Sequence, residues 1–394
     1  MRILVAPDRF AGLTSVQAAD VMAAGWATGA PHDVLTRLPL SDGGPGFLEV
    51  VRAACDGELV PVTVEGPAQV ATPVPVLLVE DTTGVTAYVE AALVLGPHLL
   101  APADAPDPGA TGSAALGRLL RVVRDRGARR VVVAVGGAAT HDAGAGLLAG
   151  LGLPSGALER GGSSLADLSR GDLEGLAELR REWAEVDLVA AVDTDVQLLG
   201  LHGASAGLSS ARTVTAERAQ ALEGALSAFA HLVGDVVAQD TVRRDLLLPR
   251  GDGREHTRRL TQLPGAGAGG GLGFALAVLG GRLRAGAQVT AEVVGLARRV
   301  ADADLVLTGE QELDGHSLHD GVVAVVAAEA LRTAVPVVAV AGQVHAGRRE
   351  WGAAGLAGVY AVHERPGSAP RGQDGDLAAA LGDRVARVAR TWSR

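Results

Sequence analysis

The sequence predicts an α/β protein of two domains, one of them built on a mostly parallel, Rossmann-like sheet. Short runs rich in Val and Leu, bounded by Gly or Asp, alternate with helical stretches along much of the 394 residues. Such runs are typical of strands buried on both faces of a parallel sheet. Hydrophobic residues make up 48% of the chain and aromatic residues only 3%. The core must therefore consist of Ala, Val and Leu, which suits close packing of helices on strands.

The first third of the chain contains two strand–loop–helix units. We expect strands over residues 2–7 and 33–40, and helices over residues 14–26 and 47–55. Asp8 follows the first strand and Asp42 the second, and Gly43 and Gly44 come directly after Asp42. Because ligands bind at the carboxyl edge of open α/β sheets, both aspartates are candidates for a ligand-binding site.

The middle third has a different pattern. Alternating Val residues from 59 to 90 predict a partly antiparallel sheet. Further helices are expected over residues 113–126, 143–151, 165–183, 215–238, 322–334 and 377–391, and one from the Gly-rich segment 264–273 to residue 284. Further strands are expected over residues 131–135, 186–192, 304–308, 335–341 and 358–363, with a polar loop over residues 251–263. We therefore predict a Rossmann-like domain of residues 1–57 and 285–394, an inserted mixed α/β domain of residues 58–284, and a cleft between them.

Composition limits the class of partner. The formal net charge of −10 argues against nucleic acid. The single cysteine, Cys55, fits a reducing compartment. The apolar run at the N-terminus is short for a signal peptide, and no apolar segment of about 18 residues lacks charges or turn formers. We expect a cytoplasmic protein with no membrane partner.

A glycine-rich turn follows the predicted strand 131–135. Gly136 and Gly137 let the backbone turn sharply and leave its N–H groups uncovered, which is the geometry of an anion site. The polar side chains of Thr140 and Asp142 follow within five residues. The equally weighted alternative is a tight strand-to-helix turn without a ligand.

Two aspartates end the predicted strand 186–192. Asp193 and Asp195 are two residues apart, so on an extended segment they would point to the same face, about 6.5 Å apart. Two carboxylates in that arrangement can bind Mg²⁺ directly or through water. The alternative is a polar strand end whose acids cap the next turn.

Two later segments also carry candidate residues. Gly265, Gly267 and Gly270 have the Gly-x-Gly-x-x-Gly spacing, but the preceding Leu-Thr-Gln-Leu-Pro is no clear strand, so a nicotinamide site is a distant alternative. A backbone anion cradle is favoured over it, and close helix packing is the structural alternative. In a loop after the predicted strand 304–308, three residues are each a candidate base, metal ligand or solvated residue: Glu310, Asp314 and His319.

Six motifs, in order along the chain, resemble those of the bacterial glycerate kinase family. They are Ala6-Pro7-Asp8 with Phe10 and Gly12; Pro39-Leu40-Ser41-Asp42-Gly43-Gly44; Gly136-Gly137 with Ala139-Thr140 and Asp142; Asp193-Thr194-Asp195 with Leu198-Leu199-Gly200; Gly265-Ala266-Gly267 with Gly270-Gly271-Leu272-Gly273; and Thr308-Gly309-Glu310 with Leu313-Asp314 and Ser317-Leu318-His319. The motifs cover nearly the whole chain, which makes the resemblance specific.

The resemblance implies a kinase that phosphorylates D-glycerate, or a related small hydroxy acid, with ATP and Mg²⁺. Asp193 and Asp195 would bind Mg²⁺, and Asp42 or Asp8 would orient or deprotonate the attacking hydroxyl. Arg9 and His319 would contact substrate or phosphate. The substrate- and phosphate-binding set would also include Gly43, Gly44, Gly136, Gly137, Thr140, Asp142, Gly267, Gly270, Glu310 and Asp314. The partners would be the hydroxy acid and the nucleotide, and assembly as a homodimer stays open.

Departures from the family's pattern support an alternative. The chain contains no Lys, so all 35 basic residues are Arg. Ala11, Glu312 and Gly321 stand where the family has basic residues, Pro45 replaces its Glu, and His141 replaces its Asn. Since phosphoryl transfer depends on charge neutralisation, the alternative is a catalytically impaired paralogue that binds a small acid or nucleotide. Arg9 and Arg212 are the cations that would substitute for the missing Lys residues.

Overall fold

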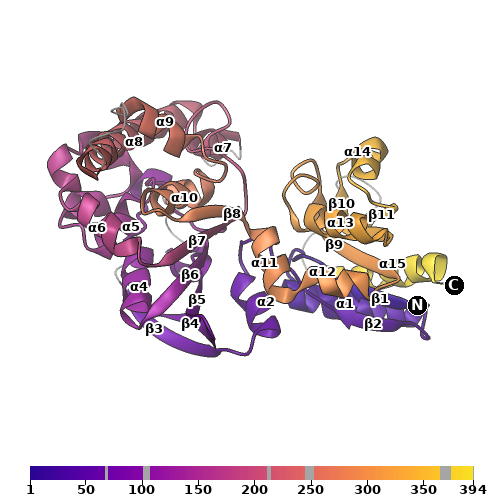
Figure 1. Ribbon diagram of the computed structural model, residues 1–394. Helices are drawn as coiled ribbons and strands as arrows, with labels where there is room; N and C mark the ends of the chain where they lie inside the picture. The colour runs from indigo at the N-terminus through magenta and orange to yellow at the C-terminus, as the bar shows by residue number, and fades with distance from the viewer. Residues whose placement is uncertain (67–69, 101–106, 211–213, 245–252, 364–373, 394) are drawn as a thin grey trace. The chain divides into compact units, whose positions relative to one another are not determined.

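The computed structural model describes residues 1–66, 70–100, 107–210, 214–244, 253–363 and 374–393. The chain forms two compact units: unit 1 contains Met1–Cys55 and Gly286–Arg394, and unit 2 contains Asp56–Ala285. Both ends of the chain, indigo and yellow in Figure 1, therefore build unit 1. One unit has a parallel sheet and the other a mixed sheet, which confirms the predicted α/β class.

Unit 1 is a five-stranded sheet in the order β11-β10-β9-β1-β2, with every pair parallel. Its strands are β1 (Arg2–Val5), β2 (Val34–Arg37), β9 (Leu305–Leu313), β10 (Val337–Val344) and β11 (Gly358–Ala361). Its helices are α1 (Ser15–Gly29), α2 (Phe47–Ala54), α11 (Gly286–Val294), α12 (Leu296–Ala301), α13 (Val322–Thr333), α14 (Arg348–Ala353) and α15 (Asp374–Trp392). The carboxyl ends of β9, β1 and β2 thus lie side by side.

Alternating side chains of β1 supply two separate cores of unit 1. Ile3 and Val5 pack in one buried cluster with residues of α1 and α15. Leu4 belongs to the cluster on the opposite face, with residues of α11, α12 and α13. This division follows from the two-residue period of a strand, and it explains why β1 is apolar on both faces.

Helix α1 begins at Ser15 because Thr14 caps it. The backbone N–H of Gln17 donates to Thr14 Oγ1 at 3.3 Å, and the backbone N–H of Thr14 donates to the Gln17 side chain at 3.0 Å. This reciprocal pair is a capping box, which satisfies donors that the first helical turn leaves open. The helix begins within one residue of the start expected from the sequence, residue 14.

Unit 2 has a six-stranded mixed sheet in the order β3-β4-β5-β6-β7-β8. Its strands are β3 (Glu58–Glu65), β4 (Ala71–Asp81), β5 (Gly84–Glu90), β6 (Ala128–Ala134), β7 (Asp187–Val192) and β8 (Arg282–Ala285). Its helices are α3 (Ala92–Leu95), α4 (Ala114–Asp125), α5 (Ala145–Leu151), α6 (Leu176–Trp183), α7 (Ala204–Ser210), α8 (Ala216–Arg244), α9 (Gly253–Thr261) and α10 (Ala268–Val278). Strands β3, β4 and β5 pair antiparallel, and β5, β6, β7 and β8 pair parallel. The antiparallel portion predicted for residues 59–90 is therefore present.

Some predicted elements differ in the structure. Residues 282–285 form strand β8 at the edge of the unit 2 sheet, not the end of a helix, and residues 253–261 are helical. The helix expected over 165–183 is limited to α6, and two short 3₁₀ helices, Gly162–Asp167 and Arg170–Leu173, precede it. Pairing with neighbouring strands and tertiary packing override local propensity at these places.

Helix α8 contains the stretch Ala216–Gln239, which by length and composition alone could cross a membrane. Half of its most apolar window is buried inside unit 2. Leu226, Phe229 and Val233 of this helix belong to the unit's main core. A buried core helix passes the same test of hydropathy, so this stretch is weak evidence for a membrane span.

Candidate active site

Three carboxylates gather at the carboxyl edge of the unit 1 sheet. Asp8 follows β1, Asp42 follows β2, and Glu310 lies on β9. These three strands are neighbours in the sheet. Glu310 was predicted to lie in a loop, but β9 continues to Leu313 because its residues pair with β10 as far as Val344. The sheet therefore fixes the position of Glu310 beside the two aspartates.

Burial perturbs two of these carboxyl groups strongly. Asp8 is 5% exposed, and burial together with the nearby charge of Asp42 holds its pKa well above the usual value. Burial raises the pKa of Glu310 to about 8, assisted by the charges of Asp314 and Asp42 and opposed by Ser317. Among the described residues, Glu310 Oε1 has no hydrogen-bond partner. Buried, mutually repelling carboxyl groups of this kind are characteristic of functional sites.

The backbone around Asp8 and Asp42 holds both side chains in place. The N–H of Arg9 donates to Asp8 Oδ1 at 2.7 Å, and the hydroxyl of Ser15 donates to the same atom at 3.3 Å. The N–H of Gly44 donates to Asp42 Oδ1 at 2.8 Å. Gly43, between them, has a φ of +96°, which favours glycine over other residues. Asp42 is half-buried and Asp8 buried, so Asp42 is the more accessible of the two.

Arg9, Asp314 and His319 also belong to unit 1. Arg9 is exposed beside Asp8, and its charge opposes the rise in the pKa of Asp8. Asp314 Oδ1 accepts from the N–H groups of His316 and Ser317 at 2.9 and 3.0 Å. Asp314 therefore organises the turn after β9, while His319 is exposed in that turn. Arg212 lies outside the described residues.

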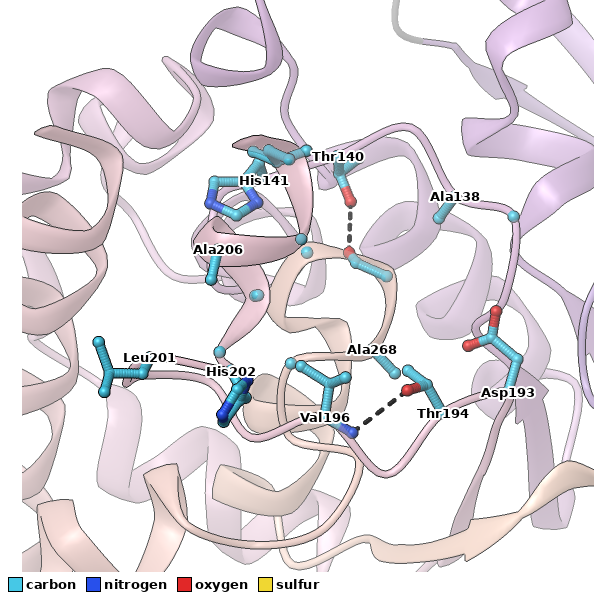
Figure 2. Close-up of a pocket in the computed structure, with 18 residues that line it drawn as sticks. Ala138, Thr140, His141, Asp193, Thr194, Val196, Leu201, His202, Ala206 and Ala268 are labelled. Carbon is cyan, nitrogen blue, oxygen red and sulfur yellow. Dashed lines mark hydrogen bonds between the residues drawn. The ribbon is translucent and has the colours of Figure 1, made fainter. Parts of the chain in front are cut away.

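Unit 2 contains a cavity of about 520 Å³, which falls in the size range of small-molecule sites. Its walls come from the loop after β6, the chain after β7, helix α7 and the Gly-rich segment at the start of α10 (Figure 2). Of the predicted residues, the cavity is lined by Gly137, Thr140, Asp193, Gly267 and Gly270. No Arg is among its lining residues within the ranges described here.

Thr140 joins two of these walls. Its hydroxyl donates to the carbonyl of Gly269 at 2.8 Å (Figure 2). Gly269, Gly270 and Gly271 all have left-handed φ values, between +59° and +101°. A Cβ at Gly270 would lie 1.8 Å from the carbonyl oxygen of Thr140. The Gly-x-Gly-x-x-Gly spacing is thus accounted for by close backbone packing at the cavity wall.

We expect Gly270→Ala to lower the free energy of unfolding by more than about 3 kcal/mol, because the left-handed φ and the clash with Thr140 both oppose a Cβ. Gly280→Ala is the matched control, since Gly280 has a φ of +95° but nothing within 4 Å of its Cβ position. Gly280→Ala should lower the free energy of unfolding by only about 1–2 kcal/mol. Denaturant unfolding of both variants measures the difference. Equal losses would show that the backbone contact at Gly270 contributes nothing.

Asp142 is directed away from the cavity and into the protein. It is fully buried, and its two oxygens accept from the N–H groups of Ser113, Gly144 and Gly146 at 2.8, 2.9 and 3.1 Å, and from the Ser113 hydroxyl at 2.8 Å. Burial raises its pKa, and these hydrogen bonds oppose the rise. This geometry favours a structural role for Asp142, as the anchor of the turn before α5. Gly136 is likewise buried and does not line the cavity.

Asp193 and Asp195 are placed differently. Strand β7 ends at Val192 and the chain bends at Asp193, so the extended geometry assumed for the pair does not apply. Asp193 is half-buried and lines the cavity, whereas Asp195 is exposed and does not. In the part of the chain that the structure describes, no three His, Cys, Asp or Glu residues are arranged to bind a metal ion. One carboxylate fits Mg²⁺ only when nucleotide phosphates and water complete its coordination.

Several cavity residues were not selected from the sequence. Leu201, 91% exposed, and His202 lie on the loop before α7, and Thr194 lies beside Asp193. His141, noted only as a departure from the family, is 2% exposed and lines the cavity. Burial lowers its pKa to about 4, so the imidazole is neutral at pH 7. Neither spacing nor residue type distinguished these cavity residues in the sequence, because α7 and its loop reach the cavity only through tertiary packing.

These features define an α/β protein built to bind small molecules, with carboxylates at the edge of one sheet and a glycine-lined cavity in the other unit. The chain belongs to the Glycerate kinase family, whose family profile matches residues 3–393. This confirms the resemblance found in the sequence.

Individual relatives agree with this assignment. The chain is 31% identical over 394 residues to a Bacillus subtilis protein named glycerate kinase, covering 98% of this chain and 96% of the relative. It is 35% identical over 370 residues to an uncharacterized Mycobacterium tuberculosis protein, covering 93% and 86%. The crystal structure of a putative glycerate kinase 2 from Salmonella typhimurium LT2 is similar with a TM-score of 0.72 and 30% identity, covering 99% of this chain and 96% of that one.

Proposed function

We propose that this protein transfers the γ-phosphoryl group of ATP to a hydroxyl group of D-glycerate, or of a closely related small hydroxy acid, with Mg²⁺. The observation that carries the proposal is the similarity to glycerate kinases along nearly the full chain in both sequence and fold. A cytoplasmic location is part of the same proposal. The roles of individual residues follow from the geometry of each unit.

In unit 1, the carboxylates bind the hydroxyl groups of the substrate. Carboxylates accept hydrogen bonds from hydroxyls but repel a second carboxylate, so the acidic cluster suits the alcohol end of a hydroxy acid. Asp42, which is more accessible than Asp8, orients or deprotonates the attacking hydroxyl. Asp8 and Glu310 support it from the buried side. Arg9, exposed beside Asp8, supplies a positive charge for the substrate carboxylate.

In unit 2, the glycine-lined cavity binds the nucleotide. Gly137, Gly267, Gly269 and Gly270 line the cavity with backbone alone, and Ala268 adds only a methyl group, so no large side chain of these segments would obstruct phosphate. Asp193 would hold Mg²⁺ together with phosphate oxygens, and Mg²⁺ when bound neutralises charge on the transferred group. The lining residues described here include no Arg, so none of them supplies a guanidinium charge to phosphate.

We expect Asp193→Asn to lower kcat/KM at least about 100-fold, the size of effect seen when one group that stabilises transition-state charge is removed. Asp195→Asn should cost less, since Asp195 is exposed and does not line the cavity. Asp167→Asn, an exposed substitution elsewhere in unit 2, is the control. A coupled ADP-release assay with ATP, Mg²⁺ and D-glycerate measures all three, and phosphorus NMR of the product identifies the phosphorylated hydroxyl. Lack of turnover with any small hydroxy acid would contradict the proposed activity.

Among the residues that the structure describes, the cavity lining contains no Arg, and this favours one second candidate, a protein that binds MgATP or a small acid with little phosphoryl transfer. Calorimetry together with the ADP-release assay separates the two candidates. MgATP binding without ADP release supports the binding protein, and MgATP binding with ADP release supports the kinase. Mg²⁺ without nucleotide should give no signal in either case, because Asp193 alone is too few ligands.

A further inference from the structure

A buried hydrogen bond between His141 and Ser205 connects two walls of the unit 2 cavity. His141 Nε2 lies 2.9 Å from Ser205 Oγ, and the two residues are 2% and 1% exposed. They are 64 residues apart in the sequence: His141 lies on the loop after β6, and Ser205 is the second residue of α7. Buried polar side chains that are fully paired fix the position of the elements carrying them.

Two consecutive residues of the loop reach different walls. Thr140 donates to the Gly269 carbonyl in the Gly-rich wall, while the ring of His141 points toward α7, where Ala206 lies (Figure 2). Together these two side-chain bonds join the loop after β6 to two other walls, α7 and the Gly-rich segment. The backbone of His141 packs closely on that of Gly162, because a Cβ at Gly162 would lie 1.9 Å from the His141 carbonyl oxygen. The loop is therefore a fixed point to which α7 is attached.

Helix α7 depends on such attachments. It has seven residues, and a helix of that length is not stable without tertiary contacts. Four of its residues, Ala204, Ala206, Gly207 and Leu208, line the cavity. A change in the position of α7 thus changes the shape of the cavity directly.

We propose that His141 is a positioning residue that, through Ser205, holds α7 as a wall of the cavity and so sets the affinity for nucleotide. The identity of the ligand rests on the proposed function, whereas the attachment of α7 does not. The neutral state of the imidazole fits this role, because Nε2 can form a hydrogen bond with the hydroxyl, as donor or as acceptor, without burying a charge. His141 is also one of the positions where this chain departs from the family's motif pattern.

Ser205→Ala is the main test, because it removes one oxygen and keeps a residue that favours helix. Amide hydrogen exchange over residues 204–208, without nucleotide, should accelerate about tenfold, as expected for loss of one buried hydrogen bond. The dissociation constant for MgATP, measured by calorimetry, should rise by a similar factor. In an active enzyme the KM for ATP should rise more than kcat falls.

Three further variants make the test specific. The double variant His141→Ala with Ser205→Ala should weaken MgATP binding no more than the weaker-binding of the two single variants. Each single substitution already removes the same His141–Ser205 hydrogen bond. His141→Gln, whose amide reaches about as far as Nε2, should restore slow exchange in α7. Thr140→Val should accelerate exchange at residues 267–270 and leave α7 protected, because Thr140 is bonded to the other wall.

Unchanged exchange in α7 of Ser205→Ala overturns the inference, whatever the wild-type protein phosphorylates. Faster exchange with unaltered MgATP affinity overturns it as well, because the wall then does not shape the nucleotide site. If the wild-type protein shows no turnover but Ser205→Ala binds MgATP more weakly than it does, the inference is supported and the proposed kinase activity is not. The failure of one proposal can therefore be distinguished from the failure of the other.

Discussion

Glu310→Gln is expected to raise the free energy of unfolding by up to about 5 kcal/mol above pH 8, the equivalent of the rise in the pKa of Glu310 from its usual 4.5 to about 8. Gln keeps the shape of the protonated carboxyl group and carries no charge. In the wild-type protein, a charge must be buried beside Asp8 and Asp42 once the pH exceeds the folded pKa. The variant removes that cost.

The sign of the pH dependence follows from proton binding. Between pH 4.5 and 8 the folded protein keeps a proton on Glu310 that the unfolded chain has lost, so wild-type stability falls as the pH rises through this window. Below pH 4.5 both states are protonated, and Glu310→Gln should match the wild-type protein. The difference should grow from pH 5 to pH 8 and then level off.

Urea unfolding at pH 4, 6, 7 and 9 measures this difference. Glu312→Gln is the matched control, because Glu312 is on the same strand, two residues away, and is exposed. It should change stability by less than about 0.5 kcal/mol at every pH. A pH-independent effect of Glu310→Gln would contradict the raised pKa. A loss of glycerate kinase activity in the more stable variant would show that the buried acid is retained for function at the expense of stability.

Asp142→Ala is expected to lower the free energy of unfolding by about 3–5 kcal/mol. It would leave the N–H groups of Ser113, Gly144 and Gly146 buried without an acceptor, as well as the Ser113 hydroxyl. A buried donor that loses its only acceptor carries its full desolvation cost. The turn that follows β6, and with it the position of Thr140 and His141, should loosen.

Thermal and urea unfolding measure the loss, with Asp167→Ala as the control because Asp167 is exposed in the same unit. The control should stay within about 0.5 kcal/mol of the wild-type protein. The structural role would be contradicted if the Asp142→Ala variant unfolded like the wild-type protein but no longer bound MgATP. That result would favour the anion-binding role inferred from the sequence.

Strands such as β1 and β7 were predictable because a run buried on both faces is continuously apolar, and the start of α1 was predictable because capping is local. β8, the end of β9 and α9 were not, because their conformation is decided by strand pairing and packing with distant residues. The stretch Arg282–Ala285 has a charged, helix-compatible composition, and only the neighbouring β7 makes it a strand.

The sequence by itself determined the α/β class, the family and the main acidic and glycine-rich segments, because these depend on residue type and order. Only the tertiary structure assigned those residues to different environments. It brought Glu310 beside Asp8 and Asp42, directed Asp142 into the interior of unit 2, and separated the cavity-lining Asp193 from the exposed Asp195. It also brought Ser205 to His141. Burial and long-range hydrogen bonding, which act between residues distant in sequence, leave no periodic signal along the chain.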